Sequence, residues 1–578
     1  MKNNYTIQTI IFAPFTAIVF LAFFSSAYKF YLLEINARII LNCQWCLVNN
    51  AILHEVQFLL TIIVLHLLSY SRYKLLALLF KSLVIVSVLI TMIDLVLLKQ
   101  FLVRFTFHEM IKFRMEFDEV IGFIHQLIAN DWKLPVLGGI ISITVLIRYL
   151  ISQRDKVKIG YMSIFALFIS IVSLDKIKPI DFHTFYLQNS LAAFFTPQSQ
   201  NKVYSKGFVN LMQTESTDNN TCYVATGQQP NIIIVMIESL SMYHSQYFSG
   251  LQNWMPELDQ ISKKGKSFPN FYANGVSTED GLISVLTGLP PIPKGSVKTE
   301  TIFEQFQNVK QSIPMLLNGL GYHTLFLTTG NLGFLNKGEW LDNIGFQHRE
   351  GHDAPFYNGM KRIHFDAAPD AALYARAIEL IQQEEKTTTP FFITLETVST
   401  HHPHVEPDMG LRSEEKVFNY ADKALGDFYS ALEKNDFFQN GYLIITSDHR
   451  AMMPLRDNEF TRYGDEAFAR IPLTMIGRDM KGKEDRAFSQ TDILPSLRHW
   501  LAKGEQCFDD NQGLFIPKQI QEPDCIYTRR SYSPDKVFVK CKSEKYTIQL
   551  DGDQTHFLNK GPSKILEQLH KLRLGNGF

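Results

Sequence analysis

Apolar residues in the first third of the chain gather in five long runs. The runs cover residues 9–33, 51–70, 74–98, 134–151 and 158–175. Each is close to the roughly 20 residues with which a helix crosses a bilayer, so we predict a five-helix transmembrane domain over residues 1–176. The first run is too long for a signal-peptide core and no small-residue cleavage pattern follows it, so we expect a retained anchor.

Basic residues in the short loops predict the orientation of this domain. Arg72 and Lys74 lie between the second and third runs, and residues 148–158 carry four basic residues between the fourth and fifth. The positive-inside rule places both loops and the N-terminus in the cytoplasm of a bacterial cell, so the chain after residue 176 lies on the periplasmic or extracellular side of the inner membrane. The basic residues of segment 99–133 argue against this orientation, because this segment should lie outside the cytoplasm. Its apolar residues recur at helical spacing, which predicts an amphipathic helix at the lipid headgroups.

Two ionisable residues, Lys81 and Asp94, interrupt the third apolar run. A charge in lipid is costly, so such residues mark either a functional site or a contact between helices. Side chains near the ends of a span can instead extend toward the membrane surface. We favour this snorkelling interpretation for both residues.

Beyond the apolar runs, the pattern becomes that of a soluble α/β protein. Residues 177–228 are rich in polar residues and predict a linker. Further on, short apolar runs that predict strands alternate with helical patterns. The strands are expected at residues 232–237, 322–327, 391–395, 443–447 and 471–476, and helices at 371–384 and 416–433. This alternation predicts one extracytoplasmic domain over residues 229–578, with a mostly parallel sheet and helices on both faces.

Net charge and cysteine content limit which partners and which disulfide bonds we expect for this chain. The formal net charge is -1, which gives no electrostatic support to a nucleic-acid partner, so we predict none. Cys43 and Cys46 form a C-x-x-C without a zinc-finger pattern, and we interpret them as a disulfide or an inert pair. An oxidising compartment would permit a bridge between Cys507 and Cys525, although their spacing does not establish one.

Groups that suit metal and phosphoryl chemistry stand where two predicted strands end. Glu238 follows the first strand, and Asp448 and His449 follow the strand over residues 443–447. The carboxyl ends of parallel strands share one edge of a sheet, and these side chains are ligands for Zn²⁺ or Mn²⁺, with Mg²⁺ as a third candidate. Thr278, between them in sequence, stands at the start of a predicted helix and could supply a fourth ligand and a hydroxyl nucleophile.

Each of these residues also has a simpler interpretation when taken alone. Thr278 could be the N-cap of its helix, and Asp448 with His449 could form a polar turn after a strand. The joint occurrence of all the groups in this order favours the metal-assisted nucleophile.

Five short stretches of the chain carry a resemblance to a known family. They are residues 235–240, 277–281 with 286–290, 397–403, 447–449 and 490–497. In this order they resemble the sulfatase-like branch of the alkaline phosphatase superfamily, and within it the group of lipoteichoic acid synthases and phosphoglycerol transferases. The resemblance extends to the five-span anchor and implies a sulfatase-like α/β catalytic domain.

The resemblance implies roles for particular residues. Glu238, Thr278, Asp448 and His449 would form the metal site, Thr278 would be the nucleophile, and His401 would contact the transferred phosphate or its headgroup. Apart from the resemblance, we place His402, in the same loop, among the substrate-binding residues; it could assist a general acid step or simply be solvated. The implied activity moves a phosphoglycerol unit from a membrane phospholipid to an extracytoplasmic glycan or lipid acceptor, through a phosphothreonine intermediate.

Departures from the family pattern keep alternatives open. Lipoteichoic acid synthases have a Phe-Trp-Asn-Arg stretch where this chain has residues 334–337, ending in Lys337. Lys337 would keep a phosphate contact as a point charge without the bidentate fork of Arg, so transfer of single units is as well supported as polymer synthesis. Phosphoethanolamine transfer, phosphodiester hydrolysis and a non-enzymatic membrane sensor are the alternatives. The Cys-x-Pro-x-Arg signature of true sulfatases is absent around Thr278.

Overall fold

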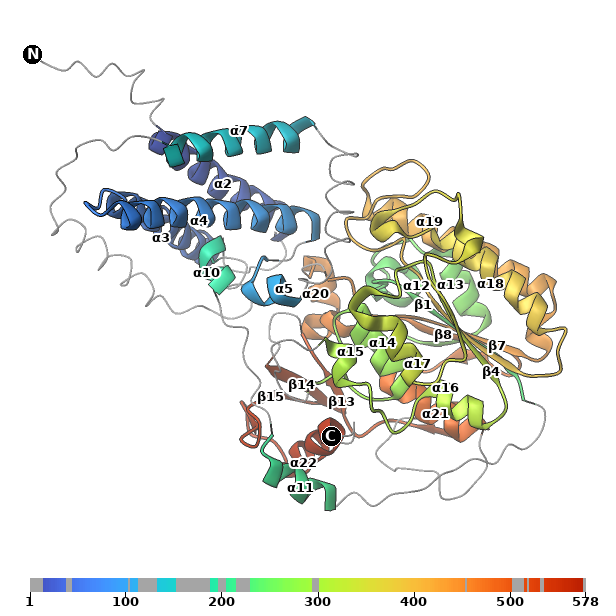
Figure 1. Ribbon diagram of the computed structural model, residues 1–578. Coiled ribbons are helices and arrows are strands. Elements are labelled where there is room, and N and C mark those ends of the chain that lie inside the picture. The colour runs from blue at the N-terminus through green and yellow to red at the C-terminus, as the bar shows by residue number, and fades with distance from the viewer. Residues whose placement is uncertain are drawn as a thin grey trace, which may run out of the picture. The chain divides into compact units, whose positions relative to one another are not determined.

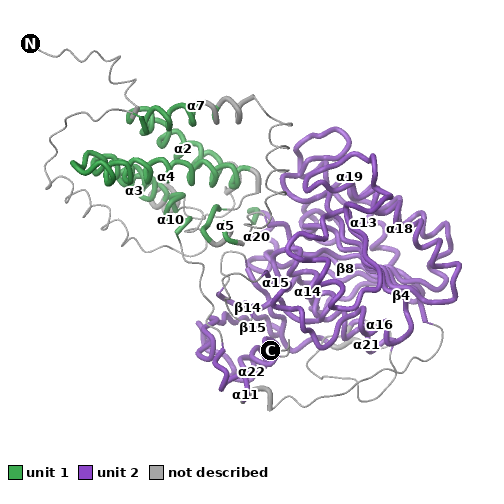
Figure 2. Tube along the Cα trace, in the orientation of Figure 1, with its two compact units in different colours: residues 1–197, 454–457 green, residues 198–453, 458–578 purple. Residues whose placement is uncertain are grey.

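The chain folds into two compact units, which we describe separately (Figures 1 and 2). In this computed structural model the first unit comprises residues 1–197 with 454–457, and the second comprises residues 198–453 with 458–578. The residues that the structure describes are 14–37, 44–101, 104–112, 133–151, 188–195, 204–214, 229–293, 301–452, 455–501, 514–516, 519–530 and 535–574.

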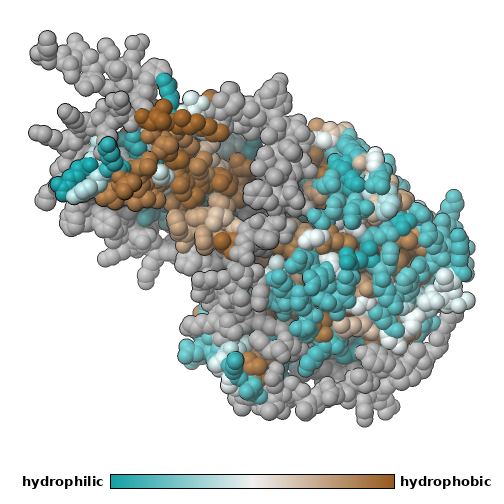
Figure 3. All heavy atoms as spheres, in the orientation of Figure 1, coloured by the Kyte–Doolittle hydropathy of each residue, from teal (hydrophilic) through white to brown (hydrophobic). Residues whose placement is uncertain are grey.

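Long apolar helices make up the first unit. They are α2 (Pro14–Ala37), α3 (Gln44–Leu68), α4 (Lys74–Phe101) and α7 (Lys133–Ile151). Within the described residues, three of them (α2, α3 and α4) are long and apolar enough to cross a membrane, and α7 contains a shorter apolar stretch, Ile141–Ile151. The predicted fifth span, 158–175, lies outside the described residues. Hydrophobic side chains dominate the visible surface of these helices (Figure 3).

Charged residues inside this unit are paired and buried. Asp94, which the sequence assigns to a snorkelling position, has no exposed surface and accepts hydrogen bonds from the Arg104 guanidinium at 2.8–3.1 Å. Lys81 is also buried and donates to the carbonyl oxygen of Tyr149. The snorkelling prediction is therefore wrong, because a partner for Asp94 stands in the segment that was expected to lie at the headgroups. The remainder of that segment, residues 113–132, lies outside the described part.

Two short helices fall within the predicted linker. Helix α10 (Ser190–Phe195) belongs to the first unit and α11 (Lys206–Thr214) to the second. Lys29 and Arg104, on the first unit, both donate to the carbonyl oxygen of Gln188 just before α10. Residues 188–195 and 204–214 of the predicted linker are therefore structured.

An eight-stranded sheet forms the centre of the second unit. Its strands run in the order β5-β4-β6-β1-β7-β8-β2-β9. Their bounds are β1 (Asn231–Ile237), β2 (Lys266–Phe268), β4 (His323–Thr328), β5 (His348–Glu350), β6 (Phe391–Glu396), β7 (Gly441–Ser447), β8 (Leu473–Ile476) and β9 (Gly482–Lys483). The first five strands in the order are parallel, which confirms the predicted mostly parallel sheet, and β8 pairs antiparallel with both β7 and β2.

Helices cover both faces of this sheet. On one face, α13 (Pro256–Lys264), α18 (Asp370–Glu384) and α19 (Glu414–Lys434) pack on β1, β6 and β7 and enclose the main hydrophobic core. The other helices include α14 (Thr278–Thr287), α16 (Ile313–Gly319), α17 (Lys337–Asn343) and α21 (Ile493–Leu501). In strand β1, every residue from Ile232 to Ile237 is buried, as expected for a parallel sheet with both faces covered.

A small antiparallel sheet follows the main domain. It contains β13 (Ile526–Thr528), β14 (Lys536–Cys541), β15 (Glu544–Gln549) and β16 (His556–Phe557), with helix α22 (Ser563–Leu574) packed on it. Cys525 and Cys541 form a disulfide at its edge. The suggested bridge from Cys507 to Cys525 is therefore wrong, because β13 and β14 pair side by side and bring Cys541 next to Cys525. Cys507 and the C-x-x-C cysteine Cys43 lie outside the described residues.

One glycine lets α14 approach the end of β7. A Cβ atom on Gly281 would stand 2.2 Å from the carbonyl oxygen of Asp448, which is far inside contact distance. The helix carrying Thr278 can reach the strand carrying Asp448 only because this position has no side chain.

The Gly281→Ala variant should therefore lose about 1–3 kcal/mol of stability through overpacking, although alanine is ordinarily the better helix former by roughly 1 kcal/mol. Gly207→Ala in α11 is a matched control, since its Cβ would meet no atom within 4 Å; it should be neutral or stabilising. Denaturant unfolding of the two variants measures this. Equal stability of both would contradict the close approach.

Candidate active site

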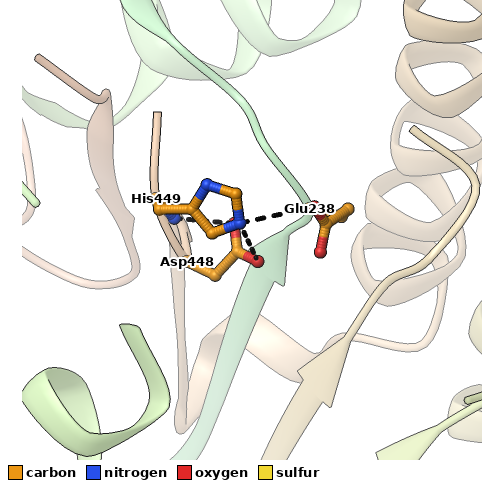
Figure 4. Close-up of side chains that lie close together, drawn as sticks. All are labelled: Glu238, Asp448 and His449. Carbon is orange, nitrogen blue, oxygen red and sulfur yellow. Dashed lines mark hydrogen bonds and ion pairs between the residues drawn. The ribbon is translucent and has the colours of Figure 1, made fainter. Parts of the chain in front are cut away.

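The site stands at the carboxyl edge of the sheet, where β1 and β7 lie side by side. Ile237 pairs with Ser447 at the last register position of these strands, so Glu238 and Asp448 leave the sheet as neighbours. His449 follows Asp448 directly. Figure 4 shows the three side chains converging from the two strand ends, and one ligand atom from each lies within 4.8 Å of the others.

Backbone and side-chain hydrogen bonds hold the two carboxylates in place. Asp448 Oδ1 accepts from the amides of Ser239 and His449 at 2.8 and 2.7 Å. Glu238 Oε1 accepts from the Ser239 hydroxyl at 2.6 Å. Ser239 sits at a positive φ of 57°, an unusual conformation for a non-glycine residue that turns its amide and hydroxyl toward the two carboxylates.

The remaining ligand atoms are buried and aimed at one another. Among the described residues, neither Asp448 Oδ2 nor His449 Nε2 has a hydrogen-bond partner. His449 Nε2 lies 3.4 Å from Asp448 Oδ2 and 3.5 Å from Glu238 Oε1. The other ring nitrogen, Nδ1, is 2.8 Å from the Arg450 carbonyl oxygen, and this contact orients the ring so that Nε2 faces the two carboxylates.

Asp448 Oδ2 and His449 Nε2, which have no hydrogen-bond partner among the described residues, are ligand atoms that suit a divalent cation. Burial raises the pKa of Asp448, and the charge of Glu238 raises it further. Burial also acts to raise the pKa of Glu238, but hydrogen bonding and the charge of His449 hold this pKa well below the usual range. Burial lowers the pKa of His449, yet the two carboxylates raise it to about 10. Two carboxylates crowded in a dry site therefore demand positive charge, which a divalent ion with oxygen and imidazole ligands would supply.

Thr278 joins this cluster through its hydroxyl. Its Oγ1 donates to Glu238 Oε2 at 3.0 Å, and the residue is only half-buried at the first position of α14. Ser277, not Thr278, is the N-cap, since its side chain accepts from the Asp280 amide. The capping interpretation of Thr278 is therefore wrong, and its hydroxyl is free to face the ligand cluster at the positive end of the helix.

The loop after β6 brings histidines to the same edge. His401 lies half-buried, its Nδ1 2.6 Å from the carbonyl oxygen of His402, and its ring stands edge-on to Phe365 with centroids 4.7 Å apart. His402 is half-buried beside it, and burial together with the charges of His404 and His401 holds its pKa well below the usual range. His402 is therefore neutral at neutral pH.

Lys337 is not part of the cluster of Glu238, Asp448 and His449. Its ammonium donates to both carboxylate oxygens of Glu396 at 2.8 Å, and the pair is buried. Glu396 ends β6 and stands in register with Met236, two residues before Glu238. The charge of Lys337 is thus balanced by Glu396 near the same sheet edge, and its role toward substrate stays a prediction.

Several supporting residues escaped the sequence analysis. Thr397 Oγ1 accepts from the Glu238 amide at 3.0 Å, and Thr400 Oγ1 donates to the Glu238 carbonyl at 2.6 Å. Gln490 Nε2 donates to the carbonyl oxygens of Ser447 and Asp448. All three stand inside the motif stretches, so the signal was present, but polar residues of these types do not reveal their partners by spacing.

The domain that carries this site is similar to known proteins. Residues 230–503 match the Sulfatase family. The chain is 23% identical to lipoteichoic acid synthase 1 of Bacillus subtilis over 308 residues, 48% of this chain and 47% of that protein. It is 20% identical to the lipoteichoic acid synthase of Staphylococcus aureus strain USA300 over 377 residues, 59% of this chain and 57% of that protein.

A solved structure, the lipoteichoic acid synthase LtaP from Listeria monocytogenes, is similar with a TM-score of 0.46 and 19% identity, over 64% of this chain and 96% of that chain. The chain spans about half the length of the curated relatives that it matches. The family match and the curated relatives confirm the resemblance of the motifs. Residues 230–503 match the Sulfatase family, and the curated relatives are lipoteichoic acid synthases, so the chain resembles the sulfatase-like branch of the alkaline phosphatase superfamily and its lipoteichoic acid synthase group.

Proposed function

We propose that this protein transfers a phosphoglycerol unit from a membrane phospholipid to an extracytoplasmic glycan or lipid acceptor. The observation that carries the proposal is the Thr278 hydroxyl, 3.0 Å from Glu238 in a cluster whose buried donor atoms fit a divalent cation. The lipoteichoic acid synthase relatives support the choice of a phosphotransferase.

The reaction has two displacement steps. Glu238 Oε2 accepts the hydrogen bond of Thr278 and orients its Oγ1 toward the phosphorus of the lipid. Oγ1 forms a bond to phosphorus, the bond from phosphorus to the diacylglycerol oxygen breaks, and diacylglycerol leaves with a proton. A hydroxyl of the acceptor then forms the new bond to phosphorus, and Thr278 recovers its hydroxyl.

The surrounding groups lower the cost of charge on the transferred phosphoryl unit. A divalent ion held by Glu238, Asp448, His449 and Thr278 would favour the ionised hydroxyl and offset negative charge on the phosphoryl oxygens. Thr278 is the first residue of α14, so the positive end of the helix dipole would favour negative charge there as well. We assign to His401 and His402 contacts with the phosphate or headgroup, and to Lys337 a position beside the headgroup through its pair with Glu396.

Membrane anchorage suits a donor that stays in the bilayer. Three described helices have the length and composition of membrane spans, and we propose five spans in all, with the catalytic domain on the periplasmic or extracellular side of the inner membrane. The Cys525–Cys541 disulfide supports an oxidising compartment.

Phosphoethanolamine transfer by the same mechanism is the second candidate. The Lys337–Glu396 pair favours it, because a carboxylate accompanies the cation where lipoteichoic acid synthases have an arginine. A headgroup with its own ammonium meets less repulsion at a neutral ion pair than at a lone cation. Incubation with either phosphatidylglycerol or phosphatidylethanolamine distinguishes the two donors by the mass of the unit attached to Thr278.

Thr278→Ala should abolish the covalent adduct and lower turnover on the order of 10³-fold or more, since the nucleophile is lost. Ser277→Ala is the matched control: it removes the neighbouring hydroxyl and costs about 1 kcal/mol of stability through the lost cap, but should keep the adduct. Intact-mass analysis and peptide mapping after incubation with lipid measure this. Retained turnover in Thr278→Ala would refute the covalent step.

His449→Ala should weaken binding of a divalent ion by at least about 100-fold, because one of few ligands disappears. His348→Ala removes a histidine that pairs with Glu350 on β5, the outermost strand of the sheet and three strands from β1. This variant should bind the ion as the wild type does. Calorimetric titration with Mn²⁺ and Zn²⁺, with elemental analysis of the purified protein, measures affinity and identifies the metal. Equal affinity in both variants would place the ion elsewhere.

A further inference from the structure

The small C-terminal sheet is joined to the loop that carries the nucleophile. Asn274 Nδ2 donates to the Tyr527 carbonyl at 2.9 Å, and the Arg529 amide donates to the Asn274 carbonyl at 2.9 Å. Asn274 stands four residues before Thr278. The residues that follow β13 therefore pair with the start of the nucleophile loop.

The Arg529 side chain continues this connection toward Thr278. It is 12% exposed and bridges two elements: its guanidinium is 3.4 and 3.5 Å from the carboxylate oxygens of Asp280 and donates to the Pro291 carbonyl at 2.9 Å. Asp280 is buried and lies two residues after Thr278 on the first turn of α14. A buried carboxylate needs a partner of opposite charge, and Arg529 is the ion-pair partner that the structure gives it.

Asp280 in turn closes the loop around the nucleophile. Its Oδ2 accepts from the Val276 amide at 3.0 Å, so the carboxylate holds the chain on both sides of Thr278. A Cβ atom on Gly275 would stand 2.1 Å from the Asp280 Cβ, which shows how tightly the loop folds over this side chain. Movement of Asp280 would therefore move Thr278 relative to Glu238.

We propose that Arg529 is a positioning residue for the Thr278 nucleophile, acting through Asp280, and that the C-terminal sheet is part of the catalytic unit. Arg529 lies beyond residues 230–503, the part that matches the Sulfatase family. The proposal rests on the proposed function in that it concerns the same nucleophile. It adds that residues outside the family match set the geometry of the reaction.

A second buried arginine of the same subdomain provides a matched control. Arg573, on α22, is 1% exposed and donates to the Pro293 carbonyl at 3.1 Å through Nε, two residues beyond the carbonyl that Arg529 binds. It also donates to the Tyr204 hydroxyl at 2.9 Å. Its hydrogen bonds thus tie the subdomain to the same segment, but at Pro293 and Tyr204, outside the nucleophile loop.

The experiment compares Arg529→Met with Arg573→Met in the full chain. Arg529→Met should slow adduct formation at Thr278 by at least about tenfold, because small displacements of a reacting group are costly, while Mn²⁺ affinity should fall less than in His449→Ala, since Glu238, Asp448 and His449 keep their places. Arg573→Met should lower the unfolding temperature without slowing the adduct step. Arg529→Lys should recover part of the rate, since an ammonium can still pair with Asp280.

Hydrogen exchange of peptides covering residues 274–281 gives a readout that is independent of the donor. Exchange there should rise in Arg529→Met and stay unchanged in Arg573→Met, at a temperature where both are folded. Unchanged exchange and rate in Arg529→Met, or equal effects of the two methionine variants, would overturn the positioning role. A wild-type protein that forms no lipid-derived adduct would count against the proposed donor, and the exchange comparison would still decide the role of Arg529.

Discussion

The rest of the second unit is arranged around the burial of two carboxylates at one sheet edge. Glu238 and Asp448 stand at the ends of adjacent strands and are almost fully buried. Removing two negative charges from water is expensive unless hydrogen bonds and positive charge replace the solvent. The amide and hydroxyl of Ser239 donate to Asp448 and Glu238, and the imidazole of His449 lies beside both carboxylates, so these groups supply such replacements.

The same requirement explains why the proposed nucleophile, Thr278, lies where it does. Thr278 reaches Glu238 only because α14 approaches the end of β7 at Gly281, and because Asp280 folds the preceding loop back on itself. A hydroxyl at a helix start, next to buried carboxylates that fit a cation, is an arrangement suited to phosphoryl transfer. The arrangement is assembled from three separate stretches of chain, residues 238–239, 275–281 and 448–449, each in contact with the other two.

Buried charge also organises the first unit. Lys29 pairs with Glu55 and Arg104 pairs with Asp94, and both cations donate to the carbonyl of Gln188. In apolar surroundings an unpaired charge is far more costly than in water, so these pairs select one packing of the helices. They hold the described residue Gln188 against the helices just before the chain continues toward the catalytic domain.

The sequence by itself determined five of the eight strands of the main sheet and the residue types of the candidate site. Continuous apolar runs predicted β1, β4, β6, β7 and β8, since strands buried on both faces need them, and the parallel order put Glu238 beside Asp448 and His449. Only the tertiary structure decided the long-range pairs: Asp94 with Arg104, Lys337 with Glu396, Cys525 with Cys541, and Asp280 with Arg529. A side chain's type states what kind of partner it needs, but which partner it meets depends on how the chain packs, and no local pattern carries that information.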